Sequence, residues 1–400
     1  METPTSQALG LLLGQGSGVA PLVHVQVPDG SEEMVECPLN LLCALAIVKQ
    51  ITSVKDLEVM LNSLVSADDF DRALSLTRFA ISFTKSVVTR IDISKILKDS
   101  KYAVQVQEMI GSISCAELLP CFQGNVLSLA LNPLGCRVVQ KFIETCSVEE
   151  AMSLVHPELS SRVVELSLDV NGNHVIQKII DKLPSKECRF IVDSLVGPDM
   201  AVRRMAPHCY GCRVIQRLVS RCDKAVVEPV LEALCADPSL VASLSEDVFG
   251  NYVMQHAIEF GRDIDRERII LCLASLNVVE LGCSKFASNV IEKIIRWHNK
   301  NSAGNGVIVT KLLINSMLTT VDPVNRELGI LSLMKDRYGN YVVRAVIELT
   351  RPEFASEVAL VKSLIIENAQ ELKNYTFSWH LVERMDKMVD VLGALRNHGF

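Results

Sequence analysis

The chain repeats one short signature six times, and this repetition constrains the fold more than any other feature of the sequence. The signature ends at residues 140, 177, 216, 255, 292 and 344, in steps of 37, 39, 39, 37 and 52. A period near 38 with helical spacing of the apolar residues predicts an α-solenoid, in which each repeat packs only against its neighbours. The six copies are Leu134–Gln140, Asn171–Gln177, Tyr210–Gln216, Phe249–Gln255, Phe286–Glu292 and Tyr338–Arg344.

On a helical wheel, each copy divides into an apolar and a polar side. We number positions from the residue that follows the signature glycine, which is Ala287 in the fifth copy. Positions 3, 4, 7 and 8 are apolar and share one side, whereas positions 1, 2, 5 and 6 form a polar arc on the other. We therefore expect the helix to bury one side and to expose positions 1, 2, 5 and 6 along one surface of the solenoid.

The polar arc has a composition that suits single-stranded nucleic acid. Position 2 carries flat or forked side chains, which stack on planar rings. Position 5 is an amide in four copies, and an amide both donates and accepts hydrogen bonds, as the edge of an unpaired base does. Position 6 is mostly basic and suits phosphate. The predicted base-edge residues, at positions 1 and 5, are Cys136, Gln140, Asn173, Gln177, Cys212, Gln216, Asn251, Gln255, Ser288, Glu292, Asn340 and Arg344. The predicted stacking residues are Arg137, His174, Arg213, Tyr252, Asn289 and Tyr341. The predicted phosphate contacts are Lys141, Lys178, Arg217, His256 and Lys293.

Composition excludes several other classes of protein. The formal net charge of −7 argues against a protein that coats nucleic acid by charge alone, and the mean hydropathy of +0.26 argues against wholesale disorder. The thirteen cysteines are expected to be free thiols in a reducing, cytoplasmic setting. Cys209 and Cys212 form a Cys-x-x-Cys string, but no second pair follows at zinc-finger spacing, so we expect neither metal nor cofactor.

The signatures resemble those of the Pumilio family of RNA-binding repeats. The resemblance rests on Asn-Tyr-Val-x-Gln, Cys-Arg-Val-x-Gln and Asn-His-Val-x-Gln, and on the unusual Phe-Ala-Ser-Asn-Val-x-Glu of the fifth copy. It implies an all-α fold, a solenoid of about eight stacked three-helix repeats forming a crescent. Six repeats are well formed and the N-terminal ones are degenerate. The expected organisation is a mobile tail at 1–35, degenerate repeats at 36–121, six repeats at 122–362 and a capping repeat at 363–400.

The resemblance also implies which base each copy reads, with the RNA antiparallel to the protein. The first and third copies would read A, the second and fourth U, and the fifth G. A carboxylate such as Glu292 only accepts hydrogen bonds, which matches the two N–H donors on the guanine edge. The implied site is about 5′-NGUAUA-3′, within the UGUA type of element.

Two parts of the chain depart from the family pattern. Arg344 stands where the family has glutamine, and arginine cannot accept a hydrogen bond from uracil N3–H, so the first base is left open. Upstream, residues 98–110 look like a remnant of another repeat, in which Gln105 and Gln107 offer two rival registers.

The resemblance further implies the role of the protein. We expect a monomeric cytoplasmic repressor of translation or stability that binds mRNA 3′ untranslated regions. It would recruit a deadenylase complex or other repressor proteins through its convex face. The alternative is a protein-binding scaffold of the armadillo or HEAT type without RNA specificity. We expect neither an enzyme nor a membrane protein, because no Ser/His/Asp order, HExxH, Walker loop or long apolar run is evident.

Overall fold

The structure is a computed structural model that describes residues 22–26, 32–36, 91–235, 237–301 and 305–385. Contacts within the chain divide it into two compact units, Met1–Ser160 and Ser161–Phe400. The described residues are overwhelmingly helical, as the repeat period predicts. Among them, no helix combines the length and apolar character that a membrane span requires.

In the part of the first unit that the structure describes, there are a β-hairpin and six helices. Strands β1 (Leu22–Gln26) and β2 (Glu32–Glu36) pair in antiparallel register, with Leu22 opposite Glu36. The hairpin falls largely within the segment expected as a mobile tail, and the rest of that tail and residues 37–90 lie outside the described residues. The helices are α5 (Ile93–Ile96), α6 (Ser100–Ser112), α7 (Cys115–Phe122), α8 (Val126–Ala130), α9 (Gly135–Thr145) and α10 (Val148–Leu159).

The second unit contains five repeats in sequence. Each repeat is a short helix, a signature helix and a longer third helix, and the 3-10 turn η1 (Ser160–Arg162) precedes the first. The first three repeats comprise α11 (Val163–Leu168), α12 (Gly172–Lys182), η2 (Ser185–Cys188) with α13 (Arg189–Val196), α14 (Ala201–Met205), α15 (Gly211–Arg221), α16 (Lys224–Cys235), α17 (Pro238–Glu246), α18 (Gly250–Phe260) and α19 (Asp263–Ala274). The last two comprise α20 (Val278–Cys283), α21 (Ala287–Asn301), α22 (Asn305–Thr319), α23 (Gly329–Lys335), α24 (Gly339–Ile347), η3 (Pro352–Phe354) and α25 (Ala355–Glu367).

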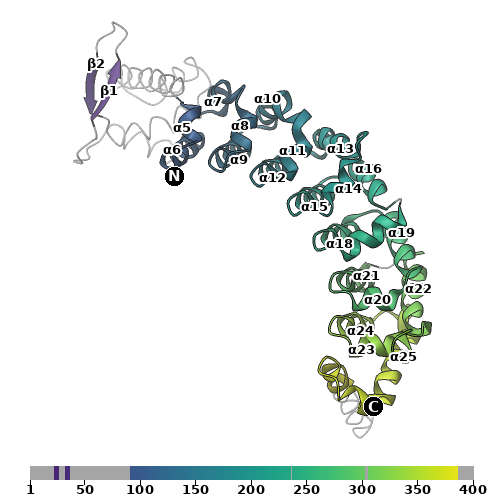
Figure 1. The fold of residues 1–400 in the computed structure, drawn as a ribbon. Coiled ribbons are helices and arrows are strands. Elements are labelled where there is room, and N and C mark those ends of the chain that lie inside the picture. Colours follow the sequence, from purple (N-terminus) through teal and green to yellow (C-terminus); the bar gives the residue numbers. More distant parts are fainter. Residues whose placement is uncertain (1–21, 27–31, 37–90, 236, 302–304, 386–400) are drawn as a thin grey trace, which may run out of the picture. The chain divides into compact units, whose positions relative to one another are not determined.

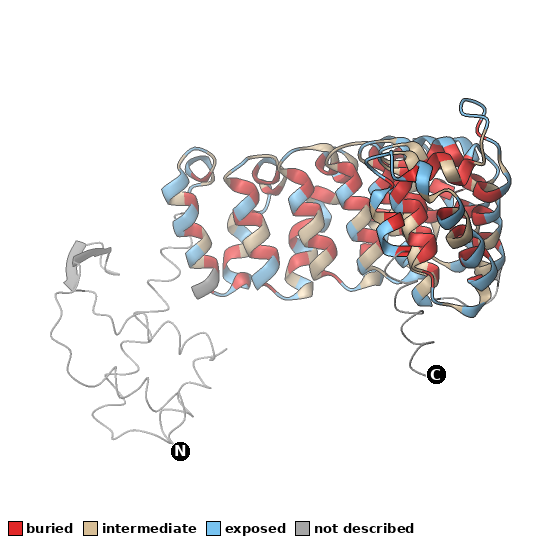
Figure 2. Ribbon diagram, turned by 90° about the horizontal axis from the view of Figure 1, so that it is seen from below, coloured by how far each residue is buried: buried red, intermediate tan, exposed pale blue. Residues whose placement is uncertain are grey.

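Within this unit the helices form two rows. The signature helices α12, α15, α18, α21 and α24 contact one another in succession, and Figure 1 shows α13, α16, α19, α22 and α25 on the other side of them. Figure 2 shows that each helix carries its buried residues on part of its surface only. Positions 3, 4, 7 and 8 of the signature are buried in every copy, so the apolar side of the wheel forms the core as expected.

A polar side chain three residues before each signature glycine caps the N-terminus of the signature helix. Asp169 Oδ1 accepts hydrogen bonds from the backbone N–H groups of Asn171 and Gly172 at 2.8 and 2.7 Å. Asp247 and Asp336 bind the equivalent N–H groups at 2.7 to 2.8 Å. These bonds satisfy donors that have no partner inside the helix. The equivalent residues of the remaining copies are Asn132, His208 and Ser284.

The signature glycine allows the signature helix to approach the short helix before it. A Cβ on Gly250 would lie 2.7 Å from the carbonyl oxygen of Leu244, and four other signature glycines have the same constraint. In the fifth copy, Ala287 occupies this position and is fully buried. At the C-terminus, Ser378 takes the place of the glycine, and its hydroxyl donates to the carbonyl of Leu372 at 2.5 Å.

The last step of the repeat is longer because both its helices and the connection that follows them are longer. Residues 320–328 connect α22 to α23, whereas residues 275–277 connect α19 to α20. Both α21 and α22 have 15 residues, whereas the equivalent α18 and α19 have 11 and 12. The sequence predicts a surface loop over 299–306, but helix extends to Asn301 and resumes at Asn305, with 302–304 outside the described residues. The last repeat is followed by α26 (Ala369–Leu372) and a helical segment at 379–385. The remainder of the expected cap, 386–400, is not described.

Candidate nucleic-acid interface

The six predicted stacking residues are all exposed. Arg137, His174, Arg213 and Asn289 lie on the exposed face of their helices. Tyr252 and Tyr341 retain 52% and 49% of their accessible surface, which is unusual for large aromatic side chains. In the second unit these residues project from consecutive helices of one row. The row therefore offers flat groups that a planar ring could contact.

The position 1 side chains are buried, contrary to the wheel. Asn173, Asn251 and Asn340 are 0%, 1% and 1% exposed, and Cys136, Cys212 and Ser288 are also buried. The turn that starts the helix covers this position. Asn173 Nδ2 donates to the carbonyls of Asp169 and Val170 at 2.8 and 2.9 Å. The accessible polar surface thus consists of the exposed position 2, the half-buried position 5 and, in the first five copies, the half-buried or exposed position 6. Position 1 lies beneath this surface.

In two copies, the residues at positions 1 and 5 form an amide pair. Gln177 Nε2 donates to Asn173 Oδ1 at 2.9 Å, and Gln255 Nε2 donates to Asn251 Oδ1 at 3.0 Å. The bond holds each glutamine in one orientation and leaves its carbonyl oxygen and one N–H to bind another group. Such a pair presents an acceptor and a donor side by side.

The first and third copies carry cysteine at position 1, and the first holds its glutamine differently. Cys136 and Cys212 direct their Sγ atoms to the carbonyls of Pro133 and Cys209, both at 3.6 Å. Gln140 Nε2 donates to the backbone carbonyl of Cys136 at 3.1 Å. In the first copy, the cysteine offers no amide, and the glutamine is bound to backbone instead.

The last two copies carry charged groups at position 5. Glu292 Oε1 accepts a hydrogen bond from Arg296 Nε at 2.7 Å. Arg344 turns away from Asn340 and donates through Nε to Glu348 Oε1 at 3.0 Å. Consequently, the buried Oδ1 atom of Asn340 has no hydrogen-bond partner within the described residues.

The predicted phosphate contacts are partly neutralised by the protein itself. Arg217 lies 3.6 Å from Asp181 of the preceding copy, and Lys293 lies 2.5 Å from Glu259 of the preceding copy. Burial lowers the pKa of His256 below its ordinary value and so disfavours the charged form of this imidazole. Lys141 and Lys178 are half-buried on their helices. The sequence analysis did not predict these acids, because they stand at position 9 of the preceding copy, outside the polar arc.

The structure selects one register for the upstream remnant. Asp99 Oδ1 accepts from the N–H groups of Lys101 and Tyr102, as the capping residues of the six copies do. Counting from this cap, Ala103 occupies position 1, Val104 position 2 and Gln107 position 5. Gln107 Nε2 donates to the carbonyl of Ala103 at 3.1 Å, which repeats the arrangement of Gln140. Gln107 is therefore the equivalent residue, and Gln105 is not.

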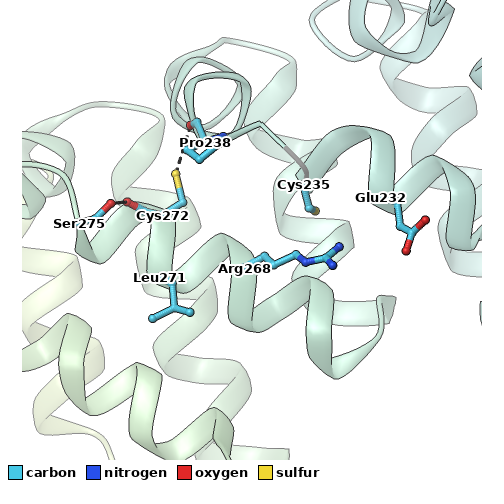
Figure 3. Close-up of a pocket in the computed structure, with 7 residues that line it drawn as sticks. All are labelled: Glu232, Cys235, Pro238, Arg268, Leu271, Cys272 and Ser275. Carbon is cyan, nitrogen blue, oxygen red and sulfur yellow. Dashed lines mark hydrogen bonds between the residues drawn. The ribbon is translucent and has the colours of Figure 1, made fainter.

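Other chemistry-bearing residues lie apart from this surface. None of the eleven cysteines of the described residues, Cys209 and Cys212 included, is in a disulfide bond. The described ranges contain no cluster of three or more metal-binding side chains. A hollow of about 690 Å³ lies in the second row, between α16 and α19 (Figure 3). Its lining includes Cys235, Arg268 and Leu271, which are not among the predicted RNA-binding residues.

Comparison with known proteins agrees with the repeat geometry. The Pumilio-family RNA binding repeat matches residues 125–156, 162–196, 202–235, 241–273, 277–297 and 329–354. A Pumilio domain-containing protein of Schizosaccharomyces pombe is 30% identical over 241 residues, covering 60% of this chain and 32% of the relative. Suppressor protein MPT5 of Saccharomyces cerevisiae is 28% identical over 255 residues, covering 58% of this chain and 29% of the relative. The chain thus spans about a third of the length of these relatives.

Two solved structures with similar folds are RNA complexes. A Puf4 variant bound to a Cox17 RNA 3′ UTR recognition sequence is 28% identical, with a TM-score of 0.60, and covers 76% of this chain and 95% of that one. A Puf3 RNA-binding domain bound to site B of a Cox17 RNA 3′ UTR recognition sequence is 27% identical, with a TM-score of 0.58, and covers 78% and 91%. The matched repeats coincide with the capped, glycine-led signature helices described above. This chain belongs to the Pumilio family.

Proposed function

We propose that this protein binds single-stranded RNA in a sequence-specific manner, one base per repeat. The observation that carries the proposal is the series of exposed flat side chains at position 2, five of which accompany a position 5 group that a hydrogen bond orients. Stacking supplies affinity for any base, and the hydrogen-bonding group at position 5 supplies selection among bases. The solved relatives named for their RNA complexes support the same conclusion.

The proposed site is about 5′-NGUAUA-3′, within UGUA-type elements. In the proposed assignment, Cys136 and Gln140 read A, and Asn173 and Gln177 read U. Cys212 and Gln216 read A, Asn251 and Gln255 read U, and Ser288 and Glu292 read G. The first base meets Asn340 and Arg344. In the second and fourth copies, the buried position 1 side chain acts by holding the glutamine at position 5.

The proposed cellular role is cytoplasmic repression of mRNA translation or stability through 3′ untranslated regions. It rests on the family resemblance and on the 3′ UTR sequences named for related complexes. Repressor proteins such as a deadenylase complex would dock on the face opposite the signature helices, and the protein would act as a monomer.

Selection of RNA from a randomised pool by the full chain tests this proposal. We expect enrichment of GUAUA-containing sequences, and a gel shift with that RNA should be abolished by replacing its guanine. Enrichment without a shared sequence, or no RNA retention, would favour the protein-binding scaffold instead.

Exchange of one reading pair tests the assignment by repeat. The double change Asn251→Ser and Gln255→Glu should convert the preference of that repeat from U to G, as in the fifth copy. Thermal unfolding should first establish that the variant folds. An unchanged preference for U in a folded variant would contradict the assignment.

A further inference from the structure

Arg296 breaks the charge pattern of its position in the repeat. Position 9 is acidic or serine in the other copies. Two of these acids pair with the position 6 cation of the next copy, Asp181 with Arg217 and Glu259 with Lys293. Arg296 has the opposite charge and pairs with carboxylates instead. The position 9 residues of the other copies are Glu144, Asp181, Ser220, Glu259 and Glu348.

Arg296 joins carboxylates from two successive signature helices. Its Nε donates to Glu292 Oε1 at 2.7 Å, one turn earlier on α21, and its Nη1 donates to Glu348 Oε2 at 2.9 Å, at the end of α24. Glu348 Oε1 also accepts from Arg344 Nε at 3.0 Å and from Arg384 Nη1 at 2.8 Å. A chain of charge-assisted hydrogen bonds therefore connects the side chains of two adjacent reading positions.

Glu348 is the junction of this chain. Its side chain is 19% exposed, whereas those of Arg296 and Arg344 are 41% and 42% exposed. Burial alone would raise the pKa of Glu348, but the hydrogen bonds from Arg344 and Arg296 outweigh it, so the pKa lies below its ordinary value. Glu348 is therefore an anion shared among three guanidinium groups. If one of these guanidinium groups moves away, the hydrogen bonds of the Glu348 carboxylate to the other two change.

The orientation of Arg344 is set from outside its own reading pair. In the second and fourth copies, the position 5 amide is held by the asparagine at position 1. In the sixth copy, Asn340 Oδ1 has no partner among the described atoms, and Arg344 is held by Glu348. The side chain at this reading position therefore depends on a group that Arg296 also binds.

We propose that Arg296 is a positioning residue for base recognition. It orients the Glu292 carboxylate and, through Glu348, couples the guanine position to the position read by Arg344. The inference rests on the proposed function. A carboxylate held on one side by a guanidinium keeps its charge and loses rotational freedom, which favours two parallel hydrogen bonds to guanine over other arrangements. When a base engages Arg344, the hold of Glu348 on Arg296 changes, and with it the position of Glu292.

The test measures dissociation constants of the full chain for four RNAs by fluorescence anisotropy. The RNAs carry G or A at the Glu292 position and U or C immediately 5′ of it. In the unmodified protein, the preference for G over A should depend on that 5′ neighbour. Arg296→Gln should reduce the preference for G by about three- to tenfold and make it independent of the neighbour. Arg296→Lys retains the charge but cannot bridge both carboxylates, so it should bind RNA and lose the dependence on the neighbour.

Arg189→Gln is the matched control. Arg189 forms the same kind of ion pair with Asp193, four residues away on α13, in the other row of helices. The substitution Arg189→Gln removes the same charge as Arg296→Gln and should leave the preference for G unchanged. In a Glu292→Gln background, Arg296→Gln should have no further effect on the G-to-A ratio, because its partner is already neutral.

The outcomes separate this inference from the proposed function. If the unmodified protein prefers G and folded Arg296→Gln retains both the preference and its dependence on the neighbour, the role of Arg296 is overturned. An equal further loss in the Glu292→Gln background would also overturn it. If the unmodified protein shows no preference for G, the proposed function fails and the inference falls with it.

Discussion

At the scale of residues, neighbouring positions of one signature have separate tasks. Asn251 is buried and bonds the carbonyls of Asp247 and Val248 at 2.8 and 3.1 Å, whereas Tyr252 projects outwards. The first side chain stabilises the start of the helix and orients Gln255. The second contributes little to the core and is available to a ligand. Stability and binding should therefore respond to different substitutions within a single repeat.

Asn251→Ala should lower the free energy of unfolding by about 1–3 kcal/mol, because it leaves buried hydrogen-bonding groups without partners. Tyr252→Ala should change the unfolding free energy by less than about 0.5 kcal/mol, as is usual for surface substitutions. It should instead weaken RNA binding by about 1–3 kcal/mol. Chemical denaturation and RNA titration of both variants would measure the two effects. Equal losses of stability would contradict this division.

His298 should make stability depend on pH. It is 1% exposed, and its Nδ1 lies 3.0 Å from the Thr310 hydroxyl and 3.1 Å from the Ile294 carbonyl. Burial lowers its pKa in the folded protein below the value in the unfolded chain. The unfolded state therefore binds a proton first as the pH falls, so the free energy of unfolding should decrease below about pH 6.5.

Thermal unfolding between pH 7.5 and 5.5 would measure this dependence. His298→Asn, which retains a nitrogen donor near Nδ1, should weaken it. His174→Asn, at an exposed site, should leave it unchanged. A stability that rises on acidification would contradict the expected sign.

At the scale of elements, each signature helix depends on a capping residue and on the space left by a glycine. The cap satisfies the first N–H groups of the helix, and the glycine lets the helix meet the carbonyl end of the short helix before it. The fifth copy shows that the approach is not identical in every repeat, since Ala287 is accommodated there at 0% exposure. This difference provides a matched pair of substitutions.

Gly250→Ala should destabilise the protein by about 1–3 kcal/mol, because the new Cβ would lie 2.7 Å from the Leu244 carbonyl oxygen and the helices must separate. Ala287→Gly removes a methyl group at the equivalent position of the fifth copy, whereas Gly250→Ala adds one. It should cost about 0.5–1 kcal/mol through backbone entropy. Denaturant titration compares the two variants. A Gly250→Ala protein as stable as the parent would mean that the short helix shifts without cost.

At the scale of the whole molecule, the acidic net charge and the proposed RNA binding are reconciled by internal pairing. Two of the basic side chains at position 6 are paired with acids of the preceding copy, Arg217 with Asp181 and Lys293 with Glu259. Such pairing reduces the general attraction for polyanions. Affinity then depends more on stacking and base-edge contacts, which are short-ranged.

The salt dependence of RNA binding should therefore be weak. Five phosphate contacts to single-stranded RNA would give a slope of about 3.5 in log Kd against log salt, and we expect a smaller value. Glu259→Gln should release Lys293 and steepen the slope, whereas Glu246→Gln, a surface acid on α17, should not. A slope of about 3.5 in the unmodified protein would mean that RNA displaces the acids.

The sequence by itself determined the repeat period, the helical class, the apolar core and the outward position of the stacking side chains. These properties follow from local periodicity, which places side chains on one face or the other of a helix. The resemblance to a known family predicted that each repeat has three helices. The capping residues were also present in the sequence as a polar residue three positions before each glycine.

Only the tertiary structure decided the burial of position 1, the register at Gln107 and the pairing between successive repeats. The turn before the helix folds over Asn173 and its equivalents, and a helical wheel contains no information about that turn. Asp181, Glu259 and Arg296 meet their partners across a helix interface, so their contacts depend on how the repeats stack. The periodicity of apolar residues determines which side of a helix faces inwards. Ion pairs between adjacent helices depend in addition on how those helices pack.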